Sequence, residues 1–439
     1  MKAQFHTLGC KLNYAETSTI ERSFINRGFK IVDDKTSCDV FVINTCSVTQ
    51  RADRECRQII RQVRRKSPNA FITVIGCYAQ LQPEEIASIE GVDLVLGSKE
   101  KFNIFSFEEN FQKYKNPKII SSPIDEVTNF GPAFTNSTES RTRAYLKIQD
   151  GCDFNCSFCT IPLARGGSRS QSIYDIKVQA RNLVANGFRE IVLTGVNVAD
   201  FGKKNNTSLL NLLDELSQIE NLSRIRISSV EPNLLSDELI KYWLKNEKIC
   251  KHFHIPLQSG SDNILKLMKR RYTSQKYREL INSIHSQNPD AGIGVDVIVG
   301  FPNEDENEFE KTFELLHELP VSYLHVFTYS ERTNTPSVFM NGRIEPKIRF
   351  ANSERLRMLG KKKKHLFHDS QKNMIHEILV ESSSDGLSLS GHSDNYLKVK
   401  IPFSEGIENS FQKVQINKID DEICYGELIN QEIFELQTK

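Results

Sequence analysis

The chain has 439 residues, of which 38% are hydrophobic and 26% are charged, and its net charge is +1 at pH 7. This length allows two or three domains with their own cores, and the balanced charge excludes binding of nucleic acid through a uniformly basic surface. No run of 18 apolar residues and no hydrophobic leader is present, so we expect a cytoplasmic protein without a membrane segment. Ten cysteines in a reducing compartment indicate metal or redox chemistry rather than disulfides.

The first predicted domain covers residues 1–116 and alternates strands with helices. Apolar runs at 3–8, 39–45 and 70–75 are typical of buried strands, and helical patterns occupy 13–27, 49–66 and 83–90. This alternation predicts a doubly wound α/β domain with a parallel sheet. Cys10, Cys46 and Cys77 each follow one of the strands closely. Because the carboxyl ends of parallel strands share one edge, we expect an iron–sulfur cluster there rather than three unrelated core cysteines.

Residues 117–142 are rich in Ser, Thr, Asn and Pro without a sustained period, which predicts a linker. The second predicted domain covers residues 143–370. Its strand candidates lie at 145–149, 190–194, 224–229, 252–255, 294–299 and 323–327, and helical patterns such as 173–186 and 304–319 separate them. Six βα units predict an open (β/α)6 partial barrel with its chemistry at the carboxyl ends of the strands.

The loop after the first strand of this domain carries Cys152, Cys156 and Cys159 in the pattern C-x3-C-x2-C. Three thiolates can ligate three irons of a [4Fe–4S] cluster and leave the fourth iron open for a small molecule. S-adenosylmethionine (SAM) requires such an open iron for its reductive cleavage to a radical. A structural zinc site usually has four N or S ligands, and this stretch of sequence offers no fourth. The spacing therefore predicts a radical-SAM site.

Other strand ends of the same domain are candidates for the SAM pocket. Thr194, Gly195 and Asn197 follow the second strand, and Gly300 follows the fifth. Glycine at a strand end lets the backbone approach a ligand, although it also serves as a simple turn. His252 and His254, in the fourth strand, are interpreted as core histidines.

The last predicted domain, residues 371–437, is all-β. Strand patterns occur at 375–381, 387–392, 396–401, 413–419 and 422–429. About five strands in fewer than 70 residues predict a small barrel of the OB type, which often binds nucleic acid. The basic helix predicted at 351–370, with four lysines at 361–364, either connects the domains or faces RNA.

Several motifs together resemble the methylthiotransferases of the radical-SAM superfamily, most closely their MtaB branch. The motifs are residues 7–13, 44–49, 76–80, 144–152, 161–166 and 254–260. They span the first two domains, and the strand pattern of the last domain resembles a TRAM domain. Residues 11–13 and 77–80 favour the MtaB branch over the related MiaB and RimO branches.

The resemblance implies an enzyme with SAM and two [4Fe–4S] clusters as cofactors. Cys152, Cys156 and Cys159 would hold the cluster that binds SAM, and Cys10, Cys46 and Cys77 would hold an auxiliary cluster that carries sulfur. The implied product is 2-methylthio-N6-threonylcarbamoyladenosine at position 37 of tRNA, with an electron donor and a sulfur source as further partners. The alternatives are isopentenyladenosine of tRNA as substrate, as in the MiaB branch, or an aspartate of a ribosomal protein, as in the RimO branch. A further alternative is a non-catalytic iron–sulfur protein that binds RNA or acts as a sensor.

The threonylcarbamoyl group of the implied substrate ends in a carboxylate. A buried carboxylate needs a cation or several hydrogen-bond donors. Arg165 and Arg169 follow the loop that carries Cys152. Arg165 belongs to a stretch shared by the three branches, which indicates a general role. Arg169 is the predicted substrate residue, with a surface or phosphate contact as the alternative.

Overall fold

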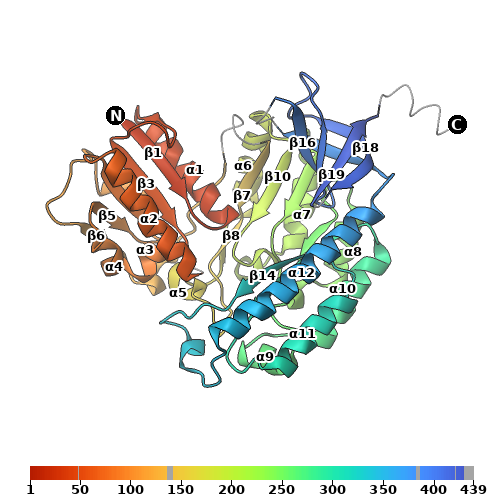
Figure 1. The fold of residues 1–439 in the computed structure, drawn as a ribbon. Helices are drawn as coiled ribbons and strands as arrows, with labels where there is room; N and C mark the ends of the chain where they lie inside the picture. The colour runs from red at the N-terminus through yellow and green to blue at the C-terminus, as the bar shows by residue number, and fades with distance from the viewer. Residues whose placement is uncertain (48, 136–141, 382–385, 421, 430–439) are drawn as a thin grey trace.

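The computed structural model describes residues 1–47, 49–135, 142–381, 386–420 and 422–429. Three parts follow one another along the chain in Figure 1: an α/β part in red and orange, a curved α/β part that runs from yellow to the lighter blue of α12 (Pro346–Ser370), and a barrel in darker blue. The predicted fold class is confirmed by the sheet topology.

The first part is built on a six-stranded parallel sheet in the order β2-β1-β3-β4-β5-β6. Its strands are β1 (Lys2–Thr7), β2 (Lys30–Ile31), β3 (Val40–Thr45), β4 (Phe71–Gly76), β5 (Val92–Leu96) and β6 (Lys118–Ile120). Helix α1 (Lys11–Ile25) packs on one face, and α2 (Gln50–Lys66), α3 (Cys77–Leu81) and α4 (Pro83–Ala87) pack on the other. Both faces are therefore covered, which explains why every residue of β3 and β4 is buried and most of them are apolar.

The central part is a curved sheet whose strands follow one another in chain order. They are β7 (Arg143–Lys147), β10 (Glu190–Thr194), β11 (Arg224–Ile227), β12 (His252–His254), β13 (Gly292–Val299) and β14 (Tyr323–Thr328). All strand pairs in it are parallel, and a bridge between Ile225 and Ile249 links its two halves. This is the predicted open six-stranded barrel.

Helices cover the outside of this half-barrel and bury the largest apolar core of the molecule. They are α6 (Ile173–Ala185), α7 (Leu209–Ser217), α8 (Asp237–Lys245), α10 (Ser274–Gln287), α11 (Glu306–Glu318) and α12 (Pro346–Ser370). Ser172, Ser208, Ser236 and Thr273 begin four of them as N-caps, since each side-chain oxygen accepts a hydrogen bond from the third residue of its helix. The short elements α5 (Ile161–Arg165), α9 (Asp262–Leu267), β8 (Gln149–Asp150) and β9 (Arg169–Ser170) lie in the connecting loops.

The C-terminal part is a closed barrel in the order β15-β16-β17-β19-β18. Its strands are β15 (Ile375–Glu381), β16 (Ser388–Ser393), β17 (Lys398–Pro402), β18 (Phe411–Asp420) and β19 (Ile423–Leu428). Arg226 of β11 donates hydrogen bonds to the carbonyl oxygens of Ser393 and Asp394, at 2.9 and 3.0 Å. The barrel is thus fixed against the amino-terminal side of the central strands.

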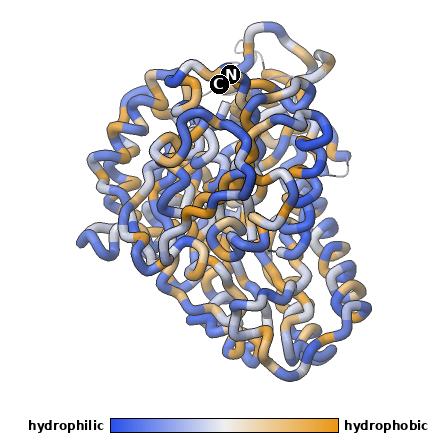
Figure 2. Tube along the Cα trace, turned by 90° about the vertical axis from the view of Figure 1, so that its left-hand side faces the viewer, coloured by the Kyte–Doolittle hydropathy of each residue, from blue (hydrophilic) through white to orange (hydrophobic). Residues whose placement is uncertain are grey.

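Two features differ from the sequence predictions. Strands β2, β5 and β6 were not predicted. Strands β2 and β6 have only two and three residues, which give no measurable hydrophobic period. Strand β6 pairs with β5, so the first residues of the expected linker 117–142 belong to the first sheet. Figure 2 shows hydrophobic and hydrophilic residues alternating along the outer helices. Accordingly, none of the helices in the described part of the chain is long and apolar enough to cross a membrane.

Candidate active site

Cys10, Cys46 and Cys77 lie together at the carboxyl edge of the first sheet. Strands β1, β3 and β4 are neighbours, and their register aligns Thr7 with Asn44 and Thr45 with Gly76. The three cysteines follow these aligned ends within one to three residues. A side chain at Gly9 would place its Cβ only 2.6 Å from the Cβ of Cys46, so the loop of Cys10 approaches Cys46 closely. The sheet topology thus brings the three cysteine positions to one edge, as the sequence predicted.

Cys152, Cys156 and Cys159 lie on the irregular loop between β8 and α5. Each sulfur faces one N–H donor. The amide of Phe154 lies 3.4 Å from Sγ of Cys152, the amide of Ile161 lies 3.5 Å from Sγ of Cys159, and the guanidinium of Arg270 lies 3.2 Å from Sγ of Cys156. Donors of this kind stabilise thiolates and tune iron–sulfur clusters.

The donor chemistry of both triplets fits iron–sulfur clusters. None of the six cysteines forms a disulfide. Burial raises the pKa of Cys152 to about 11 and that of Cys159 to about 12, so a bound cation is required to hold them as thiolates at neutral pH. Three thiols per site leave one iron of a [4Fe–4S] cluster without a cysteine, as a ligand-binding cluster needs.

The two cysteine loops touch each other. The hydroxyl of Thr160, next to Cys159, donates to the carbonyl oxygen of Ser47, next to Cys46, at 3.4 Å. Arg332 further donates to Oγ of Ser47 at 2.7 Å and pairs with Asp53 at 2.6 Å. The carboxyl edge of the first sheet therefore faces the first loop of the half-barrel.

A buried charge network joins the two parts beside the triplets. Glu16 of α1 is fully buried and accepts from Lys101 at 2.6 Å and from Lys147 and Arg165 at 3.0 Å. Arg165 also contacts Asp150 at 3.0 Å. With Arg169, which pairs with Asp150, four cations face two carboxylates. Burial raises the pKa of the Cys10 thiol, and Arg165 of this network opposes that effect because it favours the thiolate.

Removing the Glu16 charge is expected to weaken this junction strongly. Glu16→Gln leaves Lys101, Lys147 and Arg165 buried with one carboxylate fewer, and the free energy of unfolding should fall by about 3–5 kcal/mol. Anaerobic chemical denaturation at pH 7 measures this change. Glu21→Gln, on the same helix and outside the network, is the matched control and should change stability by less than about 0.5 kcal/mol. Equal stabilities of the two variants would contradict the role of the network.

The same carboxylate makes the junction sensitive to acid. Burial acts to raise the pKa of Glu16, but attraction by Arg165, Lys101 and Lys147 is stronger and holds it well below the ordinary 4.5. A lowered carboxyl pKa stabilises the folded state fully above pH 4.5, and this contribution is lost as the pH falls below that value. The difference between wild type and Glu16→Gln should therefore shrink in acid.

Three of the predicted SAM residues lie at the carboxyl end of β10. Oγ1 of Thr194 and both amide atoms of Asn197 are buried and have no hydrogen-bond partner among the described residues, and the same holds for Oγ of Ser228 after β11. Each such atom costs about 1–3 kcal/mol unless a ligand satisfies it. Gly195 packs against Gln149, where a Cβ would lie 2.9 Å from Oε1. These residues remain predictions for SAM, and their unpaired atoms fit a polar ligand.

Gly300 and Arg169 are engaged in local contacts of the fold. Gly300 has φ +80°, its amide donates to the Glu304 carboxylate, and a Cβ there would collide with Arg349. The three guanidinium nitrogens of Arg169 donate to Asp150 and to three backbone carbonyls. Because these contacts already account for both residues, their predicted ligand roles gain no support from the structure.

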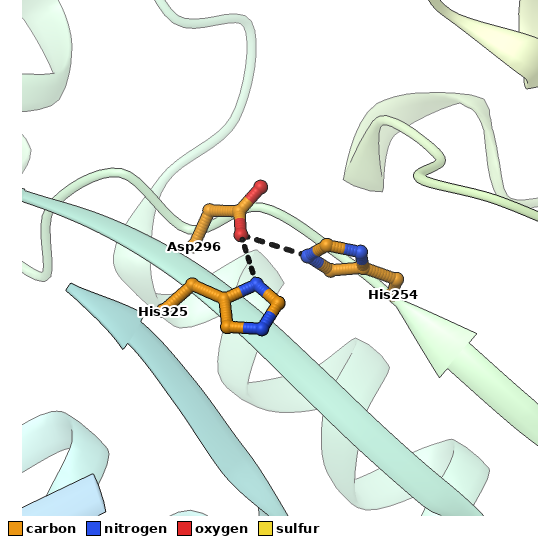
Figure 3. Close-up of side chains that lie close together, drawn as sticks. All are labelled: His254, Asp296 and His325. Atoms are coloured by element: carbon orange, nitrogen blue, oxygen red, sulfur yellow. Dashed lines mark hydrogen bonds and ion pairs between the residues drawn. The ribbon is translucent and has the colours of Figure 1, made fainter. Parts of the chain in front are cut away.

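A polar cluster on the inner wall of the half-barrel was not predicted (Figure 3). Oδ1 of Asp296 lies 2.8 Å from Nε2 of His254 and 3.2 Å from Nδ1 of His325. Burial acts against the Asp296 charge, but the two imidazoles outweigh it and hold its pKa far below the usual range. His254 is thus not a core residue, whereas His252 is buried and bonds the Tyr323 hydroxyl at 2.7 Å. Asp296 also lines a cavity of about 220 Å³ together with Cys159 and Gln258.

Arg270 was missed as well. It touches Cys156 and pairs with Glu231, which lies beyond the end of β11. In the sequence it is one of three consecutive basic residues at 269–271, a pattern that is usually a solvated surface.

Two family models match the chain. One, described as the radical SAM superfamily, matches residues 146–316. The other, described as uncharacterized protein family UPF0004, matches residues 2–97. The two matches cover the cysteine triplets of the half-barrel and of the first sheet, respectively.

Curated relatives match almost the whole chain. The threonylcarbamoyladenosine tRNA methylthiotransferase MtaB of Aquifex aeolicus is 38% identical over 91% of this chain and 96% of its own length. The enzyme of the same name from Bacillus subtilis is 38% identical over 94% of this chain and 93% of its own. A tRNA-2-methylthio-N(6)-dimethylallyladenosine synthase from Methylacidiphilum infernorum is 32% identical over 96% and 93%.

Among solved structures, the radical SAM methyltransferase TsrM from Kitasatospora setae, with cobalamin and a [4Fe-4S] cluster bound, has a TM-score of 0.57 at 12% identity. The match covers 77% of both chains and shows a shared fold. The similarity to the curated relatives is higher and extends over both cysteine triplets. The chain belongs to the radical-SAM methylthiotransferase family, in its MtaB branch.

Proposed function

We propose that this protein transfers a methylthio group to C2 of N6-threonylcarbamoyladenosine at position 37 of tRNA. The observation that carries the proposal is the contact between Thr160 and Ser47, which brings the loops of two separate cysteine triplets together. A C–H bond of an adenine ring has no acidic proton for a base to remove, so its conversion to C–S needs a radical and a sulfur donor side by side. Two adjacent clusters meet both needs.

The cofactors are two [4Fe–4S] clusters and SAM. When bound, the first cluster would supply the electron for reductive cleavage of one SAM and the second would supply the sulfur, with the methyl group coming from another SAM. In our proposal Cys152, Cys156 and Cys159 hold the first, and Cys10, Cys46 and Cys77 hold the second. Thr194 and Asn197 orient SAM through the buried polar atoms that lack partners in the described chain.

A basic groove offers a surface for the tRNA backbone. It has a volume of about 420 Å³ and lies between α12, β14 and the C-terminal barrel. Its basic lining residues are Arg357, Lys361, Lys364 and Lys398. Glu422 contacts Lys364 at 2.9 Å and Glu354 pairs with Arg357, so Lys361 and Lys398 are the lysines of this lining without an ion pair among the described residues. Phosphate groups would neutralise the remaining cations, so tRNA affinity should fall with rising salt.

The reaction needs further partners of known chemistry. An electron donor must reduce the cluster that cleaves SAM, and a sulfur source must restore the sulfur that leaves with each product. Because tRNA is found in the cytoplasm, we place the protein there. The tRNA relatives support this substrate class over the ribosomal-protein alternative.

Reconstituted protein tests the proposal directly. Incubated anaerobically with SAM, a reductant, sulfide and tRNA that carries N6-threonylcarbamoyladenosine, it should form the 2-methylthio nucleoside, detected by mass spectrometry of digested tRNA. On tRNA that carries isopentenyladenosine, kcat/KM should be at least about 100-fold lower, since polar groups of the site stay unpaired. Equal rates on both tRNAs would overturn the assignment of threonylcarbamoyladenosine as the specific substrate. SAM cleavage without any modified tRNA would exclude tRNA as the substrate. If SAM were not cleaved at all, the alternative of a non-catalytic iron–sulfur protein would be favoured.

A further inference from the structure

Lys11 occupies an unusual position at the junction of the three parts. It is the first residue of α1 and follows Cys10 directly. Its ammonium lies 5.7 Å from the ring centroid of Tyr396, which belongs to the C-terminal barrel. The Lys11 ammonium, at the start of a helix of the first part, therefore lies where the other two parts meet.

The side chains around this ammonium come from the concave side of the half-barrel. Its charged neighbours include Arg143, Glu190 and Arg226, on β7, β10 and β11. The residues that alternate with them, such as Ala144 and Ile191, pack into the outer core beneath the helices. Since side chains alternate along a strand, the charged set points to the interior.

Every cation of this set except Lys11 has a carboxylate of its own. Arg143 pairs with Glu381 at 2.9 Å. Arg226 pairs with Glu190 at 2.8 Å. The Lys11 ammonium makes no hydrogen bond and no ion pair with any residue that the structure describes. One positive charge with three unused donors is thus left facing the interior.

The aromatic rings of Tyr396, Tyr323 and His325 lie one after another between Lys11 and the predicted radical site. Tyr396 packs against Tyr323 with ring centroids 6.3 Å apart, and Tyr323 lies 5.1 Å from His325. His325 bonds Asp296, which lines the same cavity as Cys159. Flat rings along such a path suit a nucleobase, which stacks on aromatic side chains. Tyr396 is held there with φ +75°, an uncommon value for a residue with a side chain.

We propose that Lys11 binds the carboxylate of the threonyl group on the substrate adenosine and thereby sets substrate specificity. The proposal rests on the function proposed above and adds the residue that recognises the substituent. A buried carboxylate needs a cation, and Lys11 is the cation of this set that has no carboxylate partner in the described chain. Because Lys11 follows Cys10, a carboxylate bound there fixes the base beside the sulfur-carrying triplet.

Two substitutions and one change in the substrate test this role in the reconstituted holoenzyme. Lys11→Met should raise KM for tRNA with threonylcarbamoyladenosine by roughly 10- to 100-fold, because a charge-assisted hydrogen bond is lost. Lys11→Arg keeps the charge and should restore most of the affinity. Lys30→Met, at an exposed lysine of the same domain, is the matched control and should leave KM unchanged. Iron content, measured on every variant, reports whether the Cys10 loop still holds its cluster.

A change in the substrate distinguishes direct binding of the carboxylate by Lys11 from a purely structural role of this lysine. Conversion of the threonyl carboxylate to its methylamide should raise KM of the wild type by a similar factor, and should have little further effect on Lys11→Met, since the two changes remove one interaction. A wild-type KM that is insensitive to this amide would overturn the proposal, as would an equally large effect of the amide in Lys11→Met. If the wild type does not modify threonylcarbamoyladenosine at all, the proposed function itself fails, which is a different outcome.

Discussion

Replacement of Cys152, Cys156 and Cys159 together by Ala should abolish formation of 5′-deoxyadenosine and lower the iron content from about eight to about four per chain. Each of these sulfurs faces one N–H donor, from Phe154, Ile161 and Arg270, and no other cysteine lies on the loop. Loss of the three thiolates removes the cluster that reduces SAM, so no radical forms and no methylthio product follows.

Iron analysis of the anaerobically reconstituted protein and chromatography of SAM cleavage products measure both effects. The control replaces three cysteines outside the triplets, Cys38, Cys56 and Cys424, which are buried in apolar surroundings. That variant should keep about eight irons and its SAM cleavage. A Cys152, Cys156 and Cys159 variant that still forms 5′-deoxyadenosine would refute the assignment of the radical site.

Both cysteine triplets could be predicted from the sequence, for a different reason in each case. Cys152, Cys156 and Cys159 lie within eight residues, so no knowledge of the fold is needed to bring them together. Cys10, Cys46 and Cys77 are far apart, but each follows a strand, and parallel strands end at a common edge. The apolar runs of β3 and β4 identify those strands clearly, since both faces of the sheet are covered.

Contacts between distant segments could not be predicted in this way. Glu16 meets Lys147 and Arg165 only when the first sheet docks on the half-barrel, and none of the three has a motif that marks a buried ion. The same holds for Lys11 and Tyr396, which lie in the first and last parts of the chain. The place of Arg169 after the Cys152 loop predicts a substrate contact, but its hydrogen bonds to Asp150 and to three backbone carbonyls could not be read from the sequence. Spacing along the chain predicts ligand sets, whereas charge pairing between domains requires the fold.

Replacement of Cys10, Cys46 and Cys77 together by Ala should separate the two halves of the reaction. The Cys152 loop keeps its thiols and its N–H donors, because it lies on the other part of the molecule, so the variant should retain about four irons and still cleave SAM. Methylthiolated nucleoside should be absent, since the sulfur-carrying site is gone. Mass spectrometry of the tRNA, with 5′-deoxyadenosine quantified in the same samples, measures both outcomes.

The structure also indicates how this variant must be controlled. Cys10 is the N-cap of α1 and makes no side-chain cap bond, and Cys77 begins α3, so alanine at these positions removes no capping interaction. Arg165 still meets Glu16 and Asp150, which keeps the junction intact. The unfolding free energy should therefore fall far less than in Glu16→Gln when both are compared without clusters. Formation of methylthio product at the wild-type rate by this folded variant would show that the sulfur comes from elsewhere, and that the edge of the first sheet is not the sulfur-carrying site.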